Sequence, residues 1–368
     1  MSTLDELIEQ FCKDGVDYFS IGSVVEYEQP SSYIVTNTDY SNGYSIPVLT
    51  AGQSFILGFT NENEGIYNAS KDNPVIIFDD FTGSFKWVDF AFKVKSSAMK
   101  MLTAKSDKVL LRFIYHTMGK IGFSSNEHKR LWISMYSEII IPIPPLPIQL
   151  EIVRILDTFT NLQAELEAEL EAREKQFNYY RNHLLSFKDD VRRIPLINVA
   201  TVSRGVRVTK KELTEDGQYP VFQNSLSPMG FYNSFNCPSH TTYVISAGAA
   251  GEIGFCKSEF WAADDCLVIT SPGDVLNKFI YYFLLTKQDT ILAQVRNASI
   301  PRLSRIVVEN LEIPIPSTED QQRIVSILDR YDELCNDYTI GLPAEIEARR
   351  KQYEFYRNKL LTFKEKIS

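Results

Sequence analysis

The chain contains the same long segment twice. Residues 171–187 read EAREKQFNYYRNHLLSF and residues 347–363 read EARRKQYEFYRNKLLTF, with 11 of 17 positions identical at an offset of 176. Two shorter blocks upstream also recur, at an offset of 172: Ile-Pro-Ile-Pro of 141–144 at 313–316, and Ile-Val-Arg-Ile-Leu-Asp of 152–157, with one substitution, at 324–329. A period of this length excludes a solenoid of short repeats. It indicates two copies of one large unit, each about half of the 368-residue chain.

The repeated blocks belong to predicted long helices. In the first copy apolar residues recur at steps of three and four, the a/d spacing of a coiled coil: Ile148, Ile152, Ile155, Phe159, Leu162 and Leu166. The predicted helix runs from Pro147 to Phe187, and its 41 residues would extend about 60 Å. Such a helix cannot bury its apolar seam on one small domain, so we expect the second copy to supply a partner helix. Gly341–Pro343 should break or kink that second helix.

The globular segments are predicted to be α+β. Short β-rich runs occur at 74–78 and 241–245, and short helices are expected near 107–119 and 275–288. The predicted organisation has four parts: a globular domain at 1–144, a central helical region at 145–193, a second globular domain at 194–316 and a C-terminal helical region at 317–368. A unit that is duplicated in this way predicts a pseudo-twofold internal repeat.

Composition narrows the class of protein. The net charge of -9 argues against non-specific coating of nucleic acid but leaves room for local basic patches. The first residues lack the basic and apolar regions of a signal peptide, and no apolar run is long enough to span a membrane. Five cysteines, an odd number without a disulfide spacing, indicate reduced thiols and a cytoplasmic protein.

No catalytic motif is present in the sequence. It contains no HExxH pair, no Walker A loop and no GxGxxG. Two weaker patterns remain as alternatives to ordinary structural residues. Asp79, Asp80 and Lys86 could form a nuclease cluster, and Cys237, His240, Cys256 and Cys266 could bind zinc, although the spacing fits no familiar zinc motif. The glycine-rich run 248–254 is predicted to be a tight turn, with close approach to a phosphate as the alternative.

Basic and amide side chains gather in several predicted loops. Arg, Asn and Gln can bond guanine and adenine edges through two hydrogen bonds, whereas Lys suits phosphate. The candidates for DNA contact are Lys86, His128, Lys129, Arg130, Arg204, Arg207, Lys210, Lys211, Gln223, Asn224, Arg296, Asn297 and Arg302. The alternative is that these charged loops are only solvated.

With the repeat laid out, the chain resembles the specificity subunits of Type I restriction–modification systems over essentially its whole length. The marks are the duplicated Ile-Pro-Ile-Pro followed by Gln149 or by Gln321, the Ile-Val-x-Ile-Leu-Asp block and the Lys-Gln-Phe/Tyr-x-x-Tyr-Arg-Asn-x-Leu-Leu-x-Phe block. The resemblance implies two target recognition domains, each reading one half of an asymmetric, interrupted sequence in double-stranded DNA. The two helical regions would pack as an antiparallel coiled coil that holds the domains apart.

The resemblance also implies partners and a division of labour. Two copies of a modification subunit would dock on the helices and methylate adenine N6 with S-adenosylmethionine. Restriction subunits, where present, would add ATP- and Mg-dependent translocation and cleavage. The specificity subunit itself would be non-catalytic and would bind no cofactor or metal. Carried onto the matched blocks, the partner-binding residues are Gln149, Asp157, Tyr180, Arg181, Gln321, Asp329, Tyr356 and Arg357.

Three points stay open from the sequence. The region after the first helix, Glu26–Gln29, is acidic where the second domain has the basic run Arg204–Lys211, which questions whether both domains bind DNA in the same way. The main alternative function is a structural adaptor, whose helices join protein partners without base readout. Tyr180 and Tyr356 could equally be residues of the helical seam.

Overall fold

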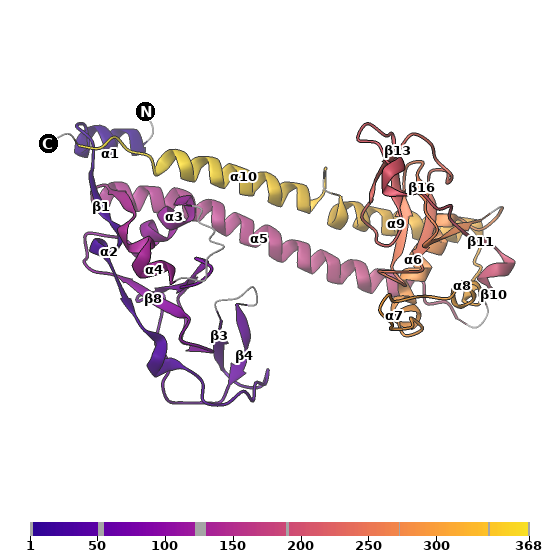
Figure 1. Ribbon diagram of the computed structural model, residues 1–368, viewed down its shortest axis with the longest axis horizontal. Coiled ribbons are helices and arrows are strands. Elements are labelled where there is room, and N and C mark those ends of the chain that lie inside the picture. Colours follow the sequence, from indigo (N-terminus) through magenta and orange to yellow (C-terminus); the bar gives the residue numbers. More distant parts are fainter. Residues whose placement is uncertain are drawn as a thin grey trace. The chain divides into compact units, whose positions relative to one another are not determined.

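The computed structural model describes residues 3–50, 55–121, 130–188, 191–271, 273–337 and 339–366 (Figure 1). The chain divides into two compact units. Unit 1 comprises Met1–Glu165 and Ile346–Ser368, and unit 2 comprises Leu166–Glu345. Each unit therefore combines one globular domain with the helical segments that pack on it. The predicted division into four parts instead separates globular segments from helical segments along the sequence.

The predicted long helices are confirmed. Helix α5 spans Leu146–Leu184 and contributes its first part to unit 1 and its second part to unit 2. Helix α9 spans Thr318–Asn336 in unit 2, and helix α10 spans Leu342–Leu360, most of it in unit 1. Of the break predicted at Gly341–Pro343, Gly341 lies between the two helices, whereas Leu342 and Pro343 are the first residues of α10. The Ser317 hydroxyl accepts a hydrogen bond from Asp320 N–H at 3.1 Å and caps the start of α9.

The globular domain of unit 1 contains two sheets. Its helices are α1 (Thr3–Phe11), α2 (Ile21–Val24), α3 (Leu111–Ile121) and α4 (Leu131–Ser134), with the 3-10 turns η1 (Pro30–Tyr33) and η2 (Tyr136–Glu138). Its strands are β1 (Asp17–Ser20), β2 (Val25–Glu28), β3 (Ile46–Leu49), β4 (Ile56–Thr60), β5 (Val75–Asp79), β6 (Phe85–Val88), β7 (Lys93–Val94), β8 (Met99–Ala104) and β9 (Ile140–Ile143). The strand orders are β2-β8-β5-β6 and β4-β3-β7, and β1 pairs with β9.

The globular domain of unit 2 repeats this topology. Its helices are α6 (Asn277–Thr286), α7 (Gln288–Leu292) and α8 (Arg305–Glu309), with the 3-10 turns η3 (Leu196–Asn198) and η4 (Lys210–Glu212). Its strands are β10 (Arg193–Pro195), β11 (Thr201–Arg204), β12 (Tyr219–Phe222), β13 (Gly230–Tyr232), β14 (Thr241–Ile245), β15 (Ile253–Cys256), β16 (Trp261–Ala262), β17 (Cys266–Thr270) and β18 (Glu312–Pro314). The orders β11-β17-β14-β15 and β13-β12-β16 match those of unit 1 strand for strand, including one parallel pair in each smaller sheet.

In each unit one helix of the globular domain shares a buried core with the larger sheet and the long helices. Phe113 and Ile114 of α3 share one buried cluster with Phe78 of β5 and with Ile148 and Ile152 of α5. Phe279 and Ile280 of α6 pack in the same way against the α9 residues Ile324 and Leu328. Buried apolar side chains thus fix each globular domain to its helical segments.

The long helices form an antiparallel aromatic seam within each unit. Phe159 of α5 stacks on Tyr356 of α10 in unit 1, with ring centroids 5.2 Å apart. Tyr180 of α5 stacks on Tyr331 of α9 in unit 2, at 5.4 Å. The two pairs occupy equivalent positions in the repeat, so the sequence duplication is also a duplication of packing.

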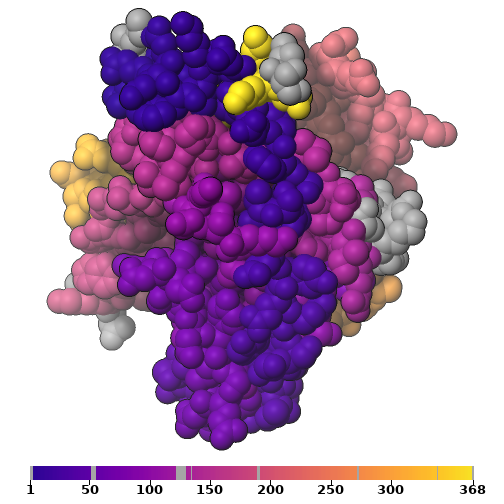
Figure 2. Space-filling view, turned by 90° about the vertical axis from the view of Figure 1, so that its left-hand side faces the viewer, coloured from indigo at the N-terminus to yellow at the C-terminus, as the bar shows by residue number. Residues whose placement is uncertain are grey.

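The two ends of the chain meet in unit 1. Val16 N–H donates to the Lys364 carbonyl at 2.9 Å, and Lys366 N–H donates to the Val16 carbonyl at 3.0 Å. Figure 2 shows the described residues near the C-terminal end, in yellow, beside the N-terminal helix α1, in indigo. The end of α10 therefore leads to β1 in unit 1, as the end of α5 leads to β10 in unit 2.

Candidate nucleic-acid and partner interfaces

In unit 2 the backbone brings several of the predicted DNA-contacting residues together. The Asn224 carbonyl accepts from Ala249 N–H at 2.9 Å, and Gly248 N–H donates to the Pro301 carbonyl at 3.2 Å. Arg296 and Arg302 exchange two backbone hydrogen bonds, at 2.9 and 3.1 Å. Three segments distant in sequence therefore form one surface, which carries the exposed side chains of Asn224, Arg296, Asn297 and Arg302.

Gly248 explains the glycine-rich run. It adopts a φ of +83°, and a Cβ at this position would lie 2.8 Å from the Asn224 carbonyl oxygen. Only glycine allows both the backbone conformation and the close approach. The predicted tight turn is confirmed, and its close neighbour is the protein's own backbone.

A second group of candidates borders the same surface. Arg204 ends β11 opposite Leu267, and the next residue, Gly205, donates its N–H to the Cys266 carbonyl at 3.0 Å. Gln223 is half-buried, and its Nε2 lies 3.5 Å from Asp265 Oδ2. Four cations of this region are exposed: Arg204, Arg207, Lys210 and Lys211.

Unit 1 places an arginine at one equivalent position. Leu131 N–H donates to the Asp80 carbonyl at 2.7 Å, as Leu303 N–H donates to the Ser246 carbonyl at 2.8 Å. Arg130 therefore occupies the place of Arg302. His128 and Lys129 lie outside the described residues, and Lys86 is exposed on β6.

At another equivalent position the two units carry opposite charges. Glu28 ends β2 opposite Met101, as Arg204 ends β11 opposite Leu267. The Tyr33 hydroxyl donates to Glu28 at 2.9 Å. The acidic stretch noticed in the sequence thus lies at the edge that is basic in unit 2, so the two domains present different chemistry on one framework.

The nuclease alternative is not supported by the geometry. Asp79 is buried and accepts the N–H groups of Phe81 and Thr82, which makes it a turn residue. Asp80 is also buried, accepts from Trp132 N–H at 2.9 Å and lies 3.2 Å from Lys100 Nζ. Both carboxylates therefore hold the fold together.

The zinc alternative is not supported either. Cys237, Cys256 and Cys266 are buried near one another, whereas His240 is exposed. Burial raises the pKa of Cys237 to about 11 and that of Cys266 to about 12, which keeps both thiols protonated. Within the part of the chain that the structure describes, no group of His, Cys, Asp or Glu is arranged to hold a metal ion.

Gln149 and Gln321 were predicted to contact a partner, and the structure corrects this. Gln149 is fully buried: its Oε1 accepts from Leu110 N–H at 2.9 Å, and its Nε2 donates to the Lys108 and Pro144 carbonyls at 3.0 and 2.7 Å. Gln321 is 1% exposed and repeats all three bonds. Its partners are Leu276 N–H at 2.9 Å and the Asp274 and Pro316 carbonyls at 3.1 Å each. Each amide ties the start of a long helix to the segment that leads into α3 or α6.

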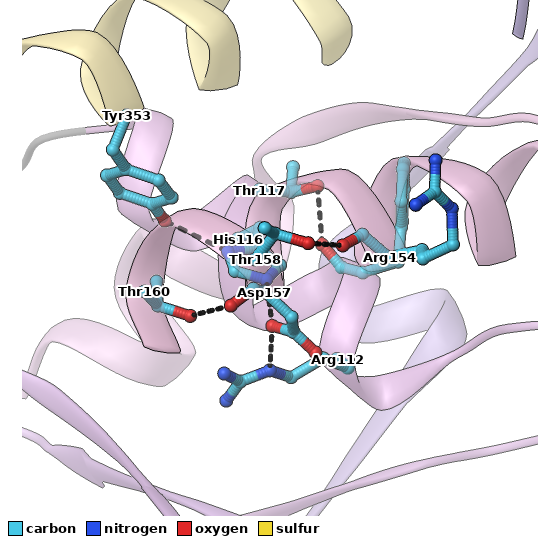
Figure 3. Close-up of polar contacts among 9 residues, drawn as sticks. Arg112, His116, Thr117, Arg154, Asp157, Thr158, Thr160 and Tyr353 are labelled. Carbon is cyan, nitrogen blue, oxygen red and sulfur yellow. Dashed lines mark hydrogen bonds and ion pairs between the residues drawn. The ribbon is translucent and has the colours of Figure 1, made fainter. Parts of the chain in front are cut away.

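Asp157 and Asp329 form equivalent polar clusters. Asp157 Oδ1 lies 2.7 Å from Arg112 Nε and 2.8 Å from His116 Nε2 (Figure 3). Asp329 Oδ1 lies 2.7 Å from Lys278 Nζ and accepts from the Tyr282 hydroxyl at 2.6 Å. Both aspartates are partly exposed. The sequence hypothesis missed their contacts, although the match of 109–115 with 275–281 already aligns Arg112 with Lys278.

The cluster in unit 1 has one further member. His116 Nδ1 lies 2.9 Å from the Tyr353 hydroxyl of α10. Burial lowers the pKa of His116, which favours the neutral ring despite the adjacent carboxylate. Since Asp157 only accepts, the neutral ring donates from Nε2, and Nδ1 accepts from Tyr353. Burial alone would raise the pKa of Asp157, but the hydrogen bonds from His116 and Arg112 outweigh it and hold that pKa below its usual value.

The other predicted partner-binding residues lie at the seam and are half-buried. Tyr180 and Tyr356 are the stacked rings described above, which agrees with the alternative that they are seam residues. The Arg181 guanidinium lies 5.7 Å from the Phe177 ring centroid, and that of Arg357 lies 5.4 Å from that of Tyr353. These arginines cover aromatic rings of their own helix and keep only part of their surface for a partner.

Comparison with known proteins decides the family. The model of the Type I restriction modification DNA specificity domain matches residues 13–173 and 188–348. The chain belongs to the family of Type I specificity subunits. The EcoR124I/EcoR124II specificity subunit of Escherichia coli is 41% identical and aligns with 99% of this chain and 97% of its own length. A putative type I specificity subunit of Haemophilus influenzae is 30% identical over 84% of this chain and 86% of its own.

A solved structure shows the same fold. The crystal structure of the S subunit of a Type I restriction–modification system from M. genitalium has a TM-score of 0.68 at 16% identity, and the match covers 94% of this chain and 96% of that one. The role of a Type I specificity subunit is DNA sequence specificity in restriction–modification, and this assignment does not favour the adaptor alternative. Among the described helices, none is long and apolar enough to cross a membrane.

Proposed function

We propose that this chain reads an asymmetric, two-part sequence in double-stranded DNA and directs adenine-N6 methylation to it. The observation that carries the proposal is the pair of globular domains, which share one topology but differ in the side chains at equivalent edges. Arg302 and Arg130 agree at one such position, whereas Arg204 and Glu28 differ at another. Two domains that differ in this way would read different half-sites.

We further propose that the chain itself is non-catalytic and binds no cofactor. Catalysis would belong to two copies of a modification subunit that bind S-adenosylmethionine, and to restriction subunits that use ATP and Mg, where these are present. The partly exposed Asp157, Asp329, Arg181 and Arg357 would contribute to equivalent docking places, one in each unit. Five free cysteines, all buried, suit a complex that acts on DNA in the cytoplasm.

The test is a map of adenine methylation in cells with and without this gene. Deletion should abolish methylation at one interrupted motif, and the full-length gene should restore it. A deletion that changes no motif, in cells where the gene is expressed with its modification subunit, would contradict the proposal. Equal and salt-insensitive binding of the complex to all duplexes would revive the adaptor.

A further inference from the structure

Asp265 is half-buried among the segments that form the candidate recognition surface of unit 2. Its backbone oxygen accepts from the N–H and the hydroxyl of Ser246, at 2.7 and 2.9 Å. The Ser246 carbonyl in turn accepts from Leu303 N–H at 2.8 Å, next to Arg302. On its other side the carboxylate faces Gln223, and the following residue, Cys266, accepts from Gly205 N–H beside Arg204. Hydrogen bonds thus tie Asp265 to the neighbours of Arg302 and Arg204.

The carboxylate has acceptor capacity left over. Its contact with Gln223 Nε2, at 3.5 Å, is at the limit of a hydrogen bond. Among the residues that the structure describes, Asp265 forms no ion pair, although arginines flank the segments around it. An ionised carboxylate can accept several hydrogen bonds. On a surface that meets phosphates it opposes binding unless a donor reaches it.

We propose that Asp265 accepts a hydrogen bond from the N4 amino group of a cytosine in the half-site that unit 2 reads. This inference rests on the proposed function. In the major groove cytosine presents only an amino donor. Adenine places the acceptor N7 beside its amino group, and guanine and thymine present acceptor atoms, all of which repel a carboxylate. Asp265 therefore selects cytosine and rejects the other three bases.

Unit 1 has no such acceptor at the equivalent position. There Asp80 N–H donates to the Ala98 carbonyl at 3.0 Å, in the place of the bond from Ser246 to Asp265. The alanine side chain cannot accept a hydrogen bond. Asp265 therefore affects only the half-site read by unit 2. The half-site read by unit 1 serves as an internal reference in the test.

The experiment uses the full-length chain with its own modification subunit, in cells that lack the chromosomal gene. The variant is Asp265→Asn, whose amide both donates and accepts and so no longer repels acceptor bases. At one position of one half-site, discrimination for cytosine should fall about tenfold or more, and the other half-site should stay unchanged. Glu319→Gln, which removes one exposed negative charge from α9, should leave the whole motif unchanged.

Three outcomes would overturn the inference. The first is an Asp265→Asn variant that methylates the wild-type motif with undiminished preference. The second is a change in the half-site read by unit 1. The third is the loss of all methylation both in Asp265→Asn and in Asp265→Ser, which keeps the backbone bonds to Ser246, because that result assigns the residue to folding. If the wild-type chain itself directs methylation to no two-part motif, the proposed function fails instead.

Discussion

His116 Nε2 lies 2.8 Å from Asp157 Oδ1, and Tyr282 makes the equivalent contact to Asp329 in unit 2 at 2.6 Å. The equivalent aspartate is thus bonded by an imidazole in unit 1 and by a phenol hydroxyl in unit 2. In unit 1 the helix α3, the first part of α5 and α10 all contribute to this one cluster (Figure 3). Any change in the charge of His116 therefore acts on three helices at once.

The stability of unit 1 should fall as the pH is lowered through the titration range of histidine. Burial lowers the pKa of His116, so the folded chain resists the proton that the unfolded chain binds near pH 6.5. The contribution of the neutral ring is complete above that pH and declines below it. Asp157, whose pKa is also lowered, acts only at more acidic pH, near 4 and below. Urea unfolding at pH 5.5 and 7.5 measures this change in stability, and the His183→Gln variant of an exposed histidine is the control. If His116→Phe shows the same pH dependence as the wild type, His116 is not the titrating group.

The cluster of unit 2 should be transferable to unit 1. Phe177 occupies in unit 2 the place of Tyr353, so the double variant His116→Tyr, Tyr353→Phe gives unit 1 the two aromatic side chains of the unit 2 cluster. We expect it to lose the pH dependence between pH 5.5 and 7.5 while remaining within about 1–2 kcal/mol of the wild-type stability. Each single variant should be less stable than the double variant, because it leaves the cluster with either two phenol hydroxyl groups or none. If the changes in stability of the two single variants simply add up in the double variant, the two side chains are not in direct contact.

Gln321→Leu should destabilise unit 2 by about 2–4 kcal/mol, because it leaves the N–H of Leu276 and two carbonyls without their partner. The neighbouring Gln322 is exposed, and Gln322→Leu should cost less than about 0.5 kcal/mol. Gln149→Leu should have the same effect on unit 1. Urea denaturation measures these changes in stability. If a variant loses binding to the modification subunit without any loss of stability, the glutamine contacts that partner after all.

Arg302→Ala should relax base preference at one position of the half-site read by unit 2, at a cost in binding of about 1–3 kcal/mol. Arg130→Ala should do the same in the other half-site, because Arg130 occupies the equivalent place. Selection from random duplexes by the complex measures both changes. Arg323→Ala, an exposed arginine on α9, is the control, and a uniform loss of affinity for all sequences would make Arg302 a phosphate contact.

The sequence by itself determined the repeat, the long helices, the break before α10 at Gly341 and the α+β class. These follow from local spacing: a/d periodicity, proline, glycine and β-rich runs act on their immediate neighbours. It also determined the family, because the duplicated blocks are specific. The residues expected to contact DNA or a partner subunit were chosen from side-chain type and from the repeat. They stay predictions, except for Gln149 and Gln321, which burial corrects.

Only the tertiary structure decided which of the repeated polar residues face inward. Gln149 and Gln321 look like surface residues in a helical pattern, but each bonds three backbone groups, two of which lie in a segment distant in sequence. The joining of Asn224, Gly248 and Arg302 likewise depends on backbone bonds between segments distant in sequence. Burial and long-range hydrogen bonding are properties of the folded chain as a whole, so a linear pattern can propose the chemistry of a residue but not its neighbours.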